Sequence, residues 1–410
     1  MSLLNFVDIQ LELNANMIWG KQKMDTTIET ELKDELEKVI ELRHSLHKIP
    51  EKSLEETKTK ETLMAFLREN TSFEIVDSGS WFYAVHHADP SATAPSSNEK
   101  QLTGAKSPIA FRADMDAVCG KDGKPGHYCG HDGHSSILSG LALYLDSHKS
   151  SWDRDVYLIF QPAEEIGKGG NVCSALLSEK NIGEVYGLHN IPGYPKNQIL
   201  TRKGTFACAS TGLEIRMTGT PSHAAYPEAG KNPGLALSKL LIQTDELTKK
   251  LNQTKGFVLM TLIGMEIGSD SYGVSASDGV LRLTVRAAKQ AIFDEYLSKI
   301  RELAQMLANE YGLELQIQEI ERFPATENDE KSTLYVQSCA KELGLSVTEL
   351  PEPMRWSEDF GYYLQKTKGA FFGVGDGEAH AQLHTEGYEF PDEIIKTAIR
   401  LFAKIEEGLE

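Results

Sequence analysis

The short stretch Gly126–Ser135, GHYCGHDGHS, contains three histidines and one cysteine. Cys129 and His131 are two positions apart, so their side chains would share one face of an extended segment. A thiolate beside an imidazole suits a borderline-soft divalent metal ion. A thiol and an imidazole that each form a hydrogen bond in a turn would explain the pair equally well. Metal binding is therefore one of two open interpretations.

Two further segments carry similar residues. IFQPAEEIGKGG places Glu164 and Glu165 directly after an apolar strand. Adjacent glutamates usually form an exposed surface pair, because neighbouring carboxylates repel each other. Pro162 and the following glycines predict a tight turn instead, in which one carboxylate can bind a metal and the other can face a water. His189 in YGLHN ends a third expected strand, where a lone histidine is more often structural. Three strand ends that deliver such residues to one sheet edge favour a shared site.

Alternating strands and helices must position these residues. The apolar patterns predict helices near 26–47 and 137–145, strands at 81–86, 109–115, 156–160 and 185–188, and a long loop at 89–107. This order predicts an α/β fold with a mixed, largely parallel sheet between helices.

The pattern changes near Gly204. Four strand-like stretches, LEIRMTG, FVLMTLIGMEIG, GVLRLTVRAA and LELQIQEIE, alternate with helical stretches near 232–252 and 292–311. They predict an α+β domain with a four-stranded sheet and two helices. We expect it to occupy 204–321, inserted into a discontinuous domain of 25–203 and 322–410.

Composition narrows the possible partners. The 410 residues carry a net charge of −18, which argues against nucleic acid and anionic membranes. No run approaches the length of apolar residues that a membrane span needs, and the first 24 residues do not resemble a signal peptide. Five scattered cysteines are typical of a reducing compartment, so we expect a cytoplasmic protein.

Several enzyme classes are excluded by their missing motifs. The sequence contains no G-x-S-x-G of a serine hydrolase, no G-x-x-x-x-G-K-[ST] and no H-E-x-x-H. GVGDG near Gly373 is too short for a dinucleotide-binding fingerprint.

The motifs FRADMDA, CGHDGH, QPAEE, GLHN, SEDF and the LH of LHTEGYEF occur in this order, between about residues 27 and 405. The order resembles that of the aminoacylase-like metallo-amidohydrolases. This group includes hippurate hydrolases, thermostable carboxypeptidases, N-acetyldiaminopimelate deacetylases and auxin-conjugate hydrolases. The resemblance implies a catalytic domain with two divalent metal ions (zinc, manganese, nickel or cobalt) and a lid domain that often forms a dimer surface. We therefore expect a homodimer or a higher homo-oligomer.

The resemblance also implies roles for single residues. Glu164 would be the general base that takes a proton from water and gives it to the leaving amine. Asp116 would orient a ligand imidazole, with Asp114 as the second candidate for this role. The metal ligands would be Cys129, His131, Glu165, His189 and His384, with the Cys129 thiolate shared by both ions.

Other residues would contact the substrate or support the site. His223 in GTPSHAAYPE resembles a lid histidine that donates to the developing oxyanion, sometimes from a partner subunit, although a local hydrogen bond is the alternative. Arg355 would grip the substrate's carboxylate with its two-pronged guanidinium, although a surface arginine is the simpler explanation. His127 and His134 would support the ligands or the fold.

The function implied is hydrolysis of the amide bond in small N-acyl amino acids or related conjugates. A dipeptidase or carboxypeptidase on the same scaffold and a non-catalytic, metal-bound binding protein remain alternatives, although the intact Glu164 favours catalysis.

The chain departs from the family pattern in places. Cys119 stands where a proline is usual, twelve residues separate Asp116 from Cys129, and Trp356 replaces a small residue. These departures predict an unusual substrate.

Overall fold

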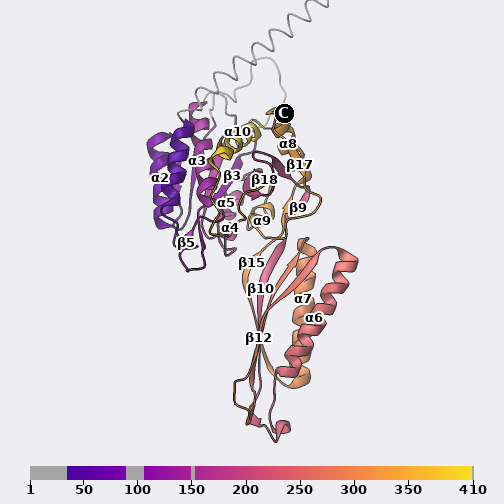
Figure 1. Cartoon of the computed structure of the whole chain (residues 1–410). Coiled ribbons are helices and arrows are strands. Elements are labelled where there is room, and N and C mark those ends of the chain that lie inside the picture. Colours follow the sequence, from indigo (N-terminus) through magenta and orange to yellow (C-terminus); the bar gives the residue numbers. More distant parts are fainter. Residues whose placement is uncertain (1–34, 89–105, 149–152, 409–410) are drawn as a thin grey trace, which may run out of the picture.

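The computed structural model describes residues 35–88, 106–148 and 153–408. It has a broad part, which contains both ends of the described chain, and a narrow part formed by the middle of the chain (Figure 1, pink to orange). Within the predicted helix at 26–47, residues 35–47 are helical, and the earlier residues lie outside the described ones. The expected loop at 89–107 also lies almost wholly outside them.

The broad part contains an eight-stranded mixed sheet, which confirms the predicted fold class. Neighbours are parallel at β3–β6, β3–β7, β7–β18 and β8–β17, and antiparallel at β1–β2, β2–β6 and β8–β18. Across the sheet the strands are β1 (Glu74–Asp77), β2 (Phe82–His86), β6 (Val156–Gln161), β3 (Ile109–Asp114), β7 (Glu184–Pro192), β18 (Lys368–Gly377), β8 (Ile199–Thr201) and β17 (Val347–Glu349).

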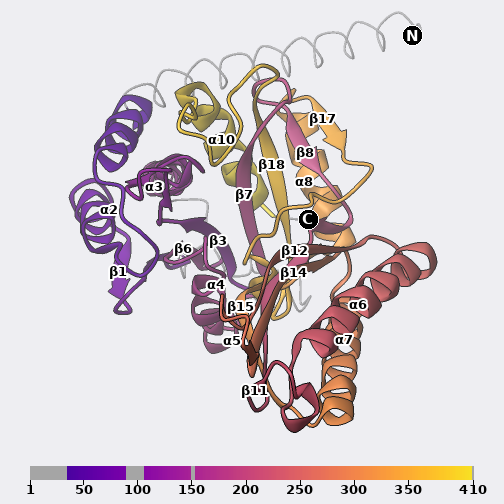
Figure 2. The same cartoon turned by 60° about the horizontal axis from the view of Figure 1, so that its bottom comes forward.

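Helices cover both faces of this sheet (Figure 2). Because successive side chains of a strand point to opposite faces, Phe82 and Ala84 join one core cluster, while Tyr83 and Val85 join another. The first cluster includes residues of the 35–47 helix, α2 (Thr57–Asn70), α3 (His131–Ser147), α8 (Glu330–Glu342) and α10 (Ile395–Glu406). The second includes residues of α4 (Gly169–Cys173), α5 (Ala175–Glu179) and α9 (Gly361–Leu364). None of the helices in the described ranges combines the length and apolar composition needed to cross a membrane.

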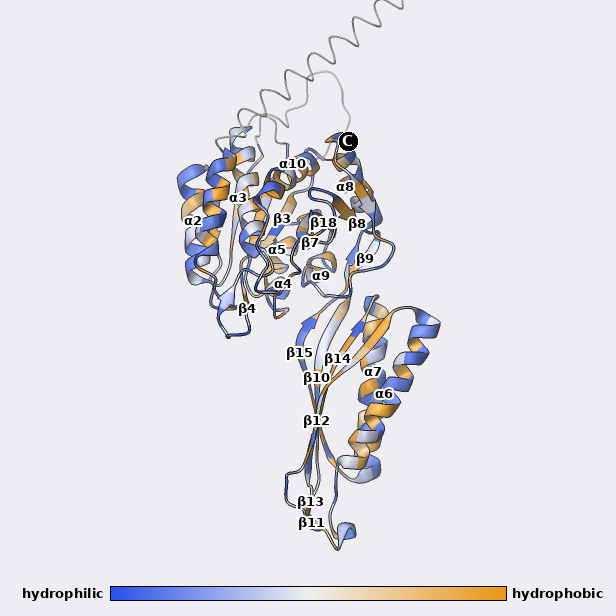
Figure 3. Cartoon of the chain, viewed as in Figure 1, coloured by the Kyte–Doolittle hydropathy of each residue, from blue (hydrophilic) through white to orange (hydrophobic). Residues whose placement is uncertain are grey.

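The narrow part is an antiparallel four-stranded sheet with two long helices on one face, as predicted. Its elements, with the strands in spatial order, are β12 (Val258–Ile267), β14 (Asp278–Ala287), β10 (Ala209–Thr218) and β15 (Glu314–Phe323), with α6 (Gly234–Lys255) and α7 (Gln290–Tyr311). Their apolar residues form a third core cluster, and apolar residues are visible along these strands and α6 (Figure 3, orange). The small pair β11 (Ser222–His223) and β13 (Val274–Ser275) lies at the far tip.

Packing suggests slightly different boundaries from those expected at 204 and 321. β9 (Gly204–Ala207) pairs with β16 (Thr326–Asn328), and its Phe206 packs in a core cluster of the broad part. Ala209 and Ala325 pack in the cluster of the narrow part. We therefore propose that the inserted domain runs from about 209 to 325. A short hairpin, β4 (Val118–Cys119) and β5 (Pro125–Gly126), lies between β3 and α3.

Candidate metal centre

The segment with Cys129 and His131 is bent rather than extended, which corrects the sequence expectation. Gly130 has φ +94° and precedes α3, whose first residue is His131. A Cβ at Gly130 would lie 2.6 Å from Asn190 Oδ1. A glycine is therefore required here by both its backbone angle and its surroundings. This left-handed turn, rather than strand alternation, brings the thiol and the imidazole to one site.

His189 lies within β7 and not at its end, because the strand continues to Pro192. Its Nδ1 lies 2.7 Å from the Asn190 carbonyl oxygen, and its Nε2 lies 3.4 Å from Cys129 Sγ. An Nδ1–H that donates to the carbonyl leaves the Nε2 lone pair available to a metal.

His384 reaches the same sulfur from a distant loop. Its Nε2 lies 3.3 Å from Cys129 Sγ, and its backbone N–H donates to the Tyr128 carbonyl at 2.8 Å. Its φ of +60° is unusual for a residue with a side chain. Such angles cluster at functional sites, where the surroundings hold them.

The five predicted ligands form two overlapping groups. Candidate ligand atoms of Cys129, His131 and His189 lie within 4.8 Å of one another, as do those of Cys129, Glu165 and His384. Glu165 also bridges the groups, because its Oε1 lies 3.5 Å from His131 Nε2 and its Oε2 lies 3.5 Å from His384 Nε2. The two groups thus share Cys129 and are linked by Glu165.

The donor atoms fit divalent cations. His131 Nε2 and Glu165 Oε1 are buried and have no hydrogen-bond partner, although buried polar atoms normally have one. Thiolate, imidazole and carboxylate together are typical ligands of zinc and similar ions.

Asp116 holds the imidazole of His131 through both its backbone carbonyl oxygen and its carboxylate. Its Nδ1 lies 2.9 Å from the Asp116 carbonyl oxygen and 3.2 Å from Asp116 Oδ1, and its Nε2 lies on the side of Glu165, 3.5 Å from Oε1. Burial would lower the pKa of His131, but Asp114, Asp116 and Glu165 outweigh this effect and raise it to about 10. The carboxylates around His131 thus attract positive charge strongly even without a metal ion.

A buried acidic cluster lies beside the ligands. Glu164, Glu358 and Asp359 have carboxylate oxygens within 4.8 Å of one another. Burial, followed by repulsion from Glu358 and Glu165, raises the pKa of Glu164 well above its usual value. Burial also raises the pKa of Asp359, to about 8. Arg112, itself buried, pairs with Glu358 at 3.0 Å and Asp359 at 2.7 Å.

Two expected supporting histidines lie behind the ligands. His134 lies between Asp114, 2.7 Å from its Nδ1, and Asn190, whose Oδ1 is in contact with its Nε2 at 2.5 Å. His127 is buried, burial lowers its pKa, and neither of its ring nitrogens has a hydrogen-bond partner.

The structural role of Arg112, Glu358 and Asp359 was missed from the sequence. Their signal was present, because Arg112 belongs to FRADMDA and both acids belong to SEDF. Nothing in the spacing, however, predicts a contact between residues nearly 250 positions apart.

Two predicted substrate residues lie outside this cluster. His223 is exposed on β11 at the far tip, and its Nδ1 accepts a hydrogen bond from Ala225 N at 3.0 Å. Arg355 is exposed, with its guanidinium 5.3 Å from the centre of the Phe257 ring. A different arginine, Arg286 of β14, donates to Ser357 Oγ at 2.9 Å and to the Arg355 carbonyl oxygen at 3.2 Å.

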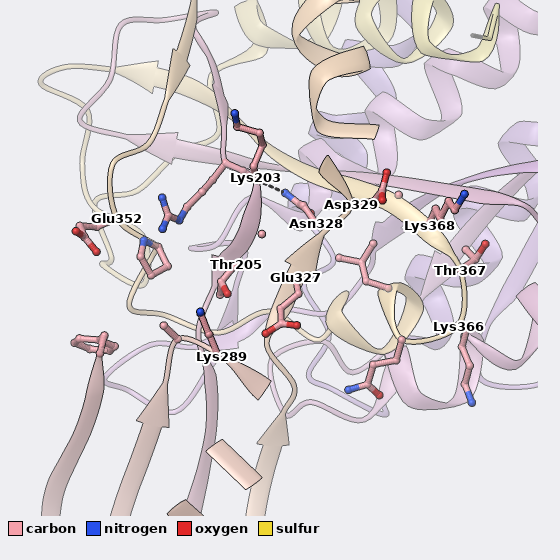
Figure 4. Close-up of a pocket in the computed structure, with 18 residues that line it drawn as sticks. Lys203, Thr205, Lys289, Glu327, Asn328, Asp329, Glu352, Lys366, Thr367 and Lys368 are labelled. Atoms are coloured by element: carbon pink, nitrogen blue, oxygen red, sulfur yellow. Dashed lines mark hydrogen bonds between the residues drawn. The ribbon is translucent and has the colours of Figure 1, made fainter. Parts of the chain in front are cut away.

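Four of the five predicted ligands, Cys129, Glu165, His189 and His384, line a cavity of about 410 Å³, which Ser357 also lines. A larger cavity of about 860 Å³ lies where the two parts of the chain meet, and Lys203, Lys289 and Glu327 are among its lining residues (Figure 4). None of the five predicted ligands lines this larger cavity. Because four of the predicted ligands and Glu164 line the smaller cavity, we assign the candidate active site to that cavity.

A three-layered catalytic part, an inserted domain and paired groups of candidate metal ligands define a metal-dependent amidohydrolase. Residues 110–407 match peptidase family M20/M25/M40, and the chain belongs to this family. It is 28% identical over 356 residues to an N-acetyldiaminopimelate deacetylase of Leuconostoc citreum, covering 82% of this chain and 88% of the relative. A similar deacetylase from Leuconostoc mesenteroides is 29% identical, covering 84% and 90%.

A solved structure shows the same fold. It is a protein of Bacillus subtilis described as a dinuclear metal binding peptidase from the M20 family, 22% identical, with a TM-score of 0.73 over 92% of this chain and 98% of the other.

Proposed function

We propose that this amidohydrolase acts on small N-acyl amino acids or related conjugates. The observation that carries the proposal is that Cys129 Sγ belongs to both candidate ligand groups and lines the same cavity as Glu164. Bound divalent ions would lower the pKa of water toward neutrality and polarise the amide carbonyl. The proposed ligands are Cys129, His131, Glu165, His189 and His384. The cytoplasmic location and the choice among zinc, manganese, nickel and cobalt stay predictions.

Glu164 is the proposed general base. Its Oε1 accepts a hydrogen bond from Asp359 N at 3.3 Å, which fixes the carboxylate at the wall of the cavity. Burial and nearby acids favour its protonated form, whereas adjacent cations would favour the ionised form. Because these two effects oppose each other, the carboxylate can take a proton from water and return it to the leaving amine.

The substrate's carboxylate needs a cation, and Arg286 is better placed than Arg355. Arg286 forms no ion pair with any described carboxylate, and burial lowers its pKa. It contacts Ser357, which lines the metal cavity, whereas Arg355 is exposed and lies over Phe257. We infer that the amino-acid half of the substrate faces the inserted domain.

We also propose that a second copy of the chain completes the site. β12 is an edge strand of the inserted domain and exposes apolar side chains, among them Ile263 at 61%. Leu235 and Ile242 are exposed on the adjacent α6. An exposed apolar edge commonly pairs with another chain. The partner's lid could then present its His223, which lies far from its own metal cluster.

A panel of substrates tests the function. The zinc- or manganese-loaded protein should release free amino acid from N-acyl amino acids, and a chelator should abolish the release. In the Glu164→Gln variant we expect kcat to fall at least about 100-fold, because the proton acceptor is lost. Its metal content, measured by elemental analysis, should match that of the parent.

Glu61→Gln, on the exposed side of α2, is the matched control and should keep full activity. Hydrolysis of dipeptides with a free amine, and not of N-acyl amino acids, would favour the dipeptidase alternative. Tight metal binding without turnover of any amide would indicate a binding protein.

A further inference from the structure

The cavity at the metal cluster has two unlike walls. One wall consists of four proposed ligands, Cys129, Glu165, His189 and His384, together with Glu164. The other lining residues are mainly apolar and form what we call the apolar wall: Ile191, Pro192, Tyr194, Phe323, Met354 and Trp356. Among the described residues, no lysine or arginine lines this cavity. A carboxylate placed against the apolar wall would lose its hydration without gaining a partner.

Trp356 lies where this apolar wall meets the ligands. The centre of its ring lies 5.4 Å from that of His189 and 6.1 Å from that of Phe206. The indole is half-buried, so part of its surface remains open to the cavity. Aromatic side chains in such pockets recognise flat apolar groups through large contact areas.

Backbone hydrogen bonds fix the position of this wall. Cys208 N contacts the carbonyl oxygens of both Met354 and Trp356 at 3.1 Å, and Met354 N donates to the Phe206 carbonyl at 2.7 Å. The wall is therefore attached to the segment that joins the two domains, and it does not depend on a free loop.

Charge sets the direction in which a substrate lies. In an N-acyl amino acid the amino-acid half carries the carboxylate and the acyl half is uncharged. Arg286, on β14 of the inserted domain, donates to Ser357 Oγ, and Ser357 lines the cavity. The uncharged acyl half is thus the one that fits the apolar wall. An acetyl group offers a single methyl to this wall, which would leave most of its apolar surface unused.

We propose that Trp356 is a specificity-determining residue that selects bulky aromatic acyl groups over acetyl. This proposal rests on the proposed function. It distinguishes the chain from the relatives whose names specify an N-acetyl substrate. Trp356 acts by direct contact with the acyl group.

Paired substrates with one amino acid and two acyl groups test the proposal. For the metal-loaded protein we expect kcat/KM for N-benzoyl-alanine to exceed that for N-acetyl-alanine at least tenfold, or about 1.4 kcal/mol. In Trp356→Ala the ratio of the two values should fall at least fivefold, whereas Trp356→Phe should keep most of it. A ratio is insensitive to the fraction of folded enzyme. Trp81→Phe, outside the cavity lining, is the matched control and should leave the ratio unchanged.

Calorimetry provides a readout that needs no turnover. The metal-loaded Glu164→Gln protein should bind benzoate at least tenfold more tightly than acetate, and adding Trp356→Ala should remove this difference. Equal binding of the two acids, or a preference for the acetyl substrate, would overturn the proposal while the proposed function stands. A benzoate preference without hydrolysis of any N-acyl amino acid would instead support the apolar subsite and refute the proposed function.

Discussion

At the scale of single residues, the motifs predicted the candidate ligands and the contact of Asp116 with a candidate ligand imidazole, but not the turn at Gly130 or the contacts of Arg112. Candidate ligand atoms of Cys129, Glu165 and His384 meet as the motifs suggested, and each of these residues lies in a bend or a turn. Gly130 was not recognised as the left-handed turn that makes this possible. Contacts such as Arg112 with Asp359 depend on the folded sheet, so no local pattern predicts them.

Asp116 offers a test at this scale. It contacts His131 Nδ1, and its Oδ2 accepts hydrogen bonds from Ser53 Oγ at 2.6 Å and Glu165 N at 3.0 Å. One carboxylate thus orients two proposed ligands. Asp116→Asn replaces one acceptor oxygen by a donor, so we expect metal affinity to fall about 10- to 100-fold. Competition with a chromophoric chelator measures the affinity.

The exposed Asp122 in the β4–β5 turn provides the control for this change. Asp122→Asn should leave metal affinity unaltered, because its carboxylate contacts only its own turn. If Asp116→Asn bound metal as tightly as the parent, the proposed orienting role would be refuted.

At the scale of elements, apolar periodicity predicted the long helices and the central strands closely. The helical stretch expected near 292–311 is α7 (Gln290–Tyr311), and Val156–Phe160 became β6 with one added residue. The short pairing of β9 with β16 was missed, because two strands of four and three residues carry too little periodicity. Because this pairing belongs to the broad part, the proposed limits of the inserted domain move from 204 and 321 to about 209 and 325.

The end of α10 gives a prediction about pH. Burial raises the pKa of Glu406 from 4.5 to about 7, although Arg154 opposes this effect. The folded protein therefore keeps a proton that the unfolded chain releases between these values. This group's contribution to stability is fully present at low pH and is lost as pH rises toward 7. Glu406→Gln cannot ionise, so its free energy of unfolding relative to the parent should rise by about 2 kcal/mol between about pH 5 and pH 8.

Urea denaturation at the two pH values measures this difference, with the exposed neighbour variant Glu407→Gln as control. An equal pH dependence of the parent and Glu406→Gln would contradict the assigned proton.

At the scale of the whole molecule, the sequence predicted an inserted domain but not where its tip would lie. The alternating strands specify the sheet of that domain, whereas the orientation of one domain to the other depends on contacts at their junction. β11, which contains His223, lies at the end of the narrow part that points away from the broad part and its candidate metal ligands (Figure 3). A role for His223 in catalysis then requires either a large movement of the lid or a second chain.

Mixing two inactive variants separates these possibilities. Glu164→Gln lacks the base but keeps His223, whereas His223→Ala lacks the lid donor but keeps Glu164. In a mixed dimer, the chain with Glu164 would receive His223 from its partner and form one complete site. Random mixing makes half of the dimers mixed, and each mixed dimer has one complete site out of two. About one quarter of the parental activity should therefore return, whereas each variant alone is nearly inactive because losing such a donor costs about 3–4 kcal/mol.

A charged variant of the proposed interface provides the control. Adding Ile263→Lys to both chains should charge the apolar edge of β12, separate the subunits in size-exclusion chromatography and abolish this recovery. Activity that stays at the sum of the separate variants, while the mixed dimer is shown to form, would place His223 in its own chain's site or outside catalysis.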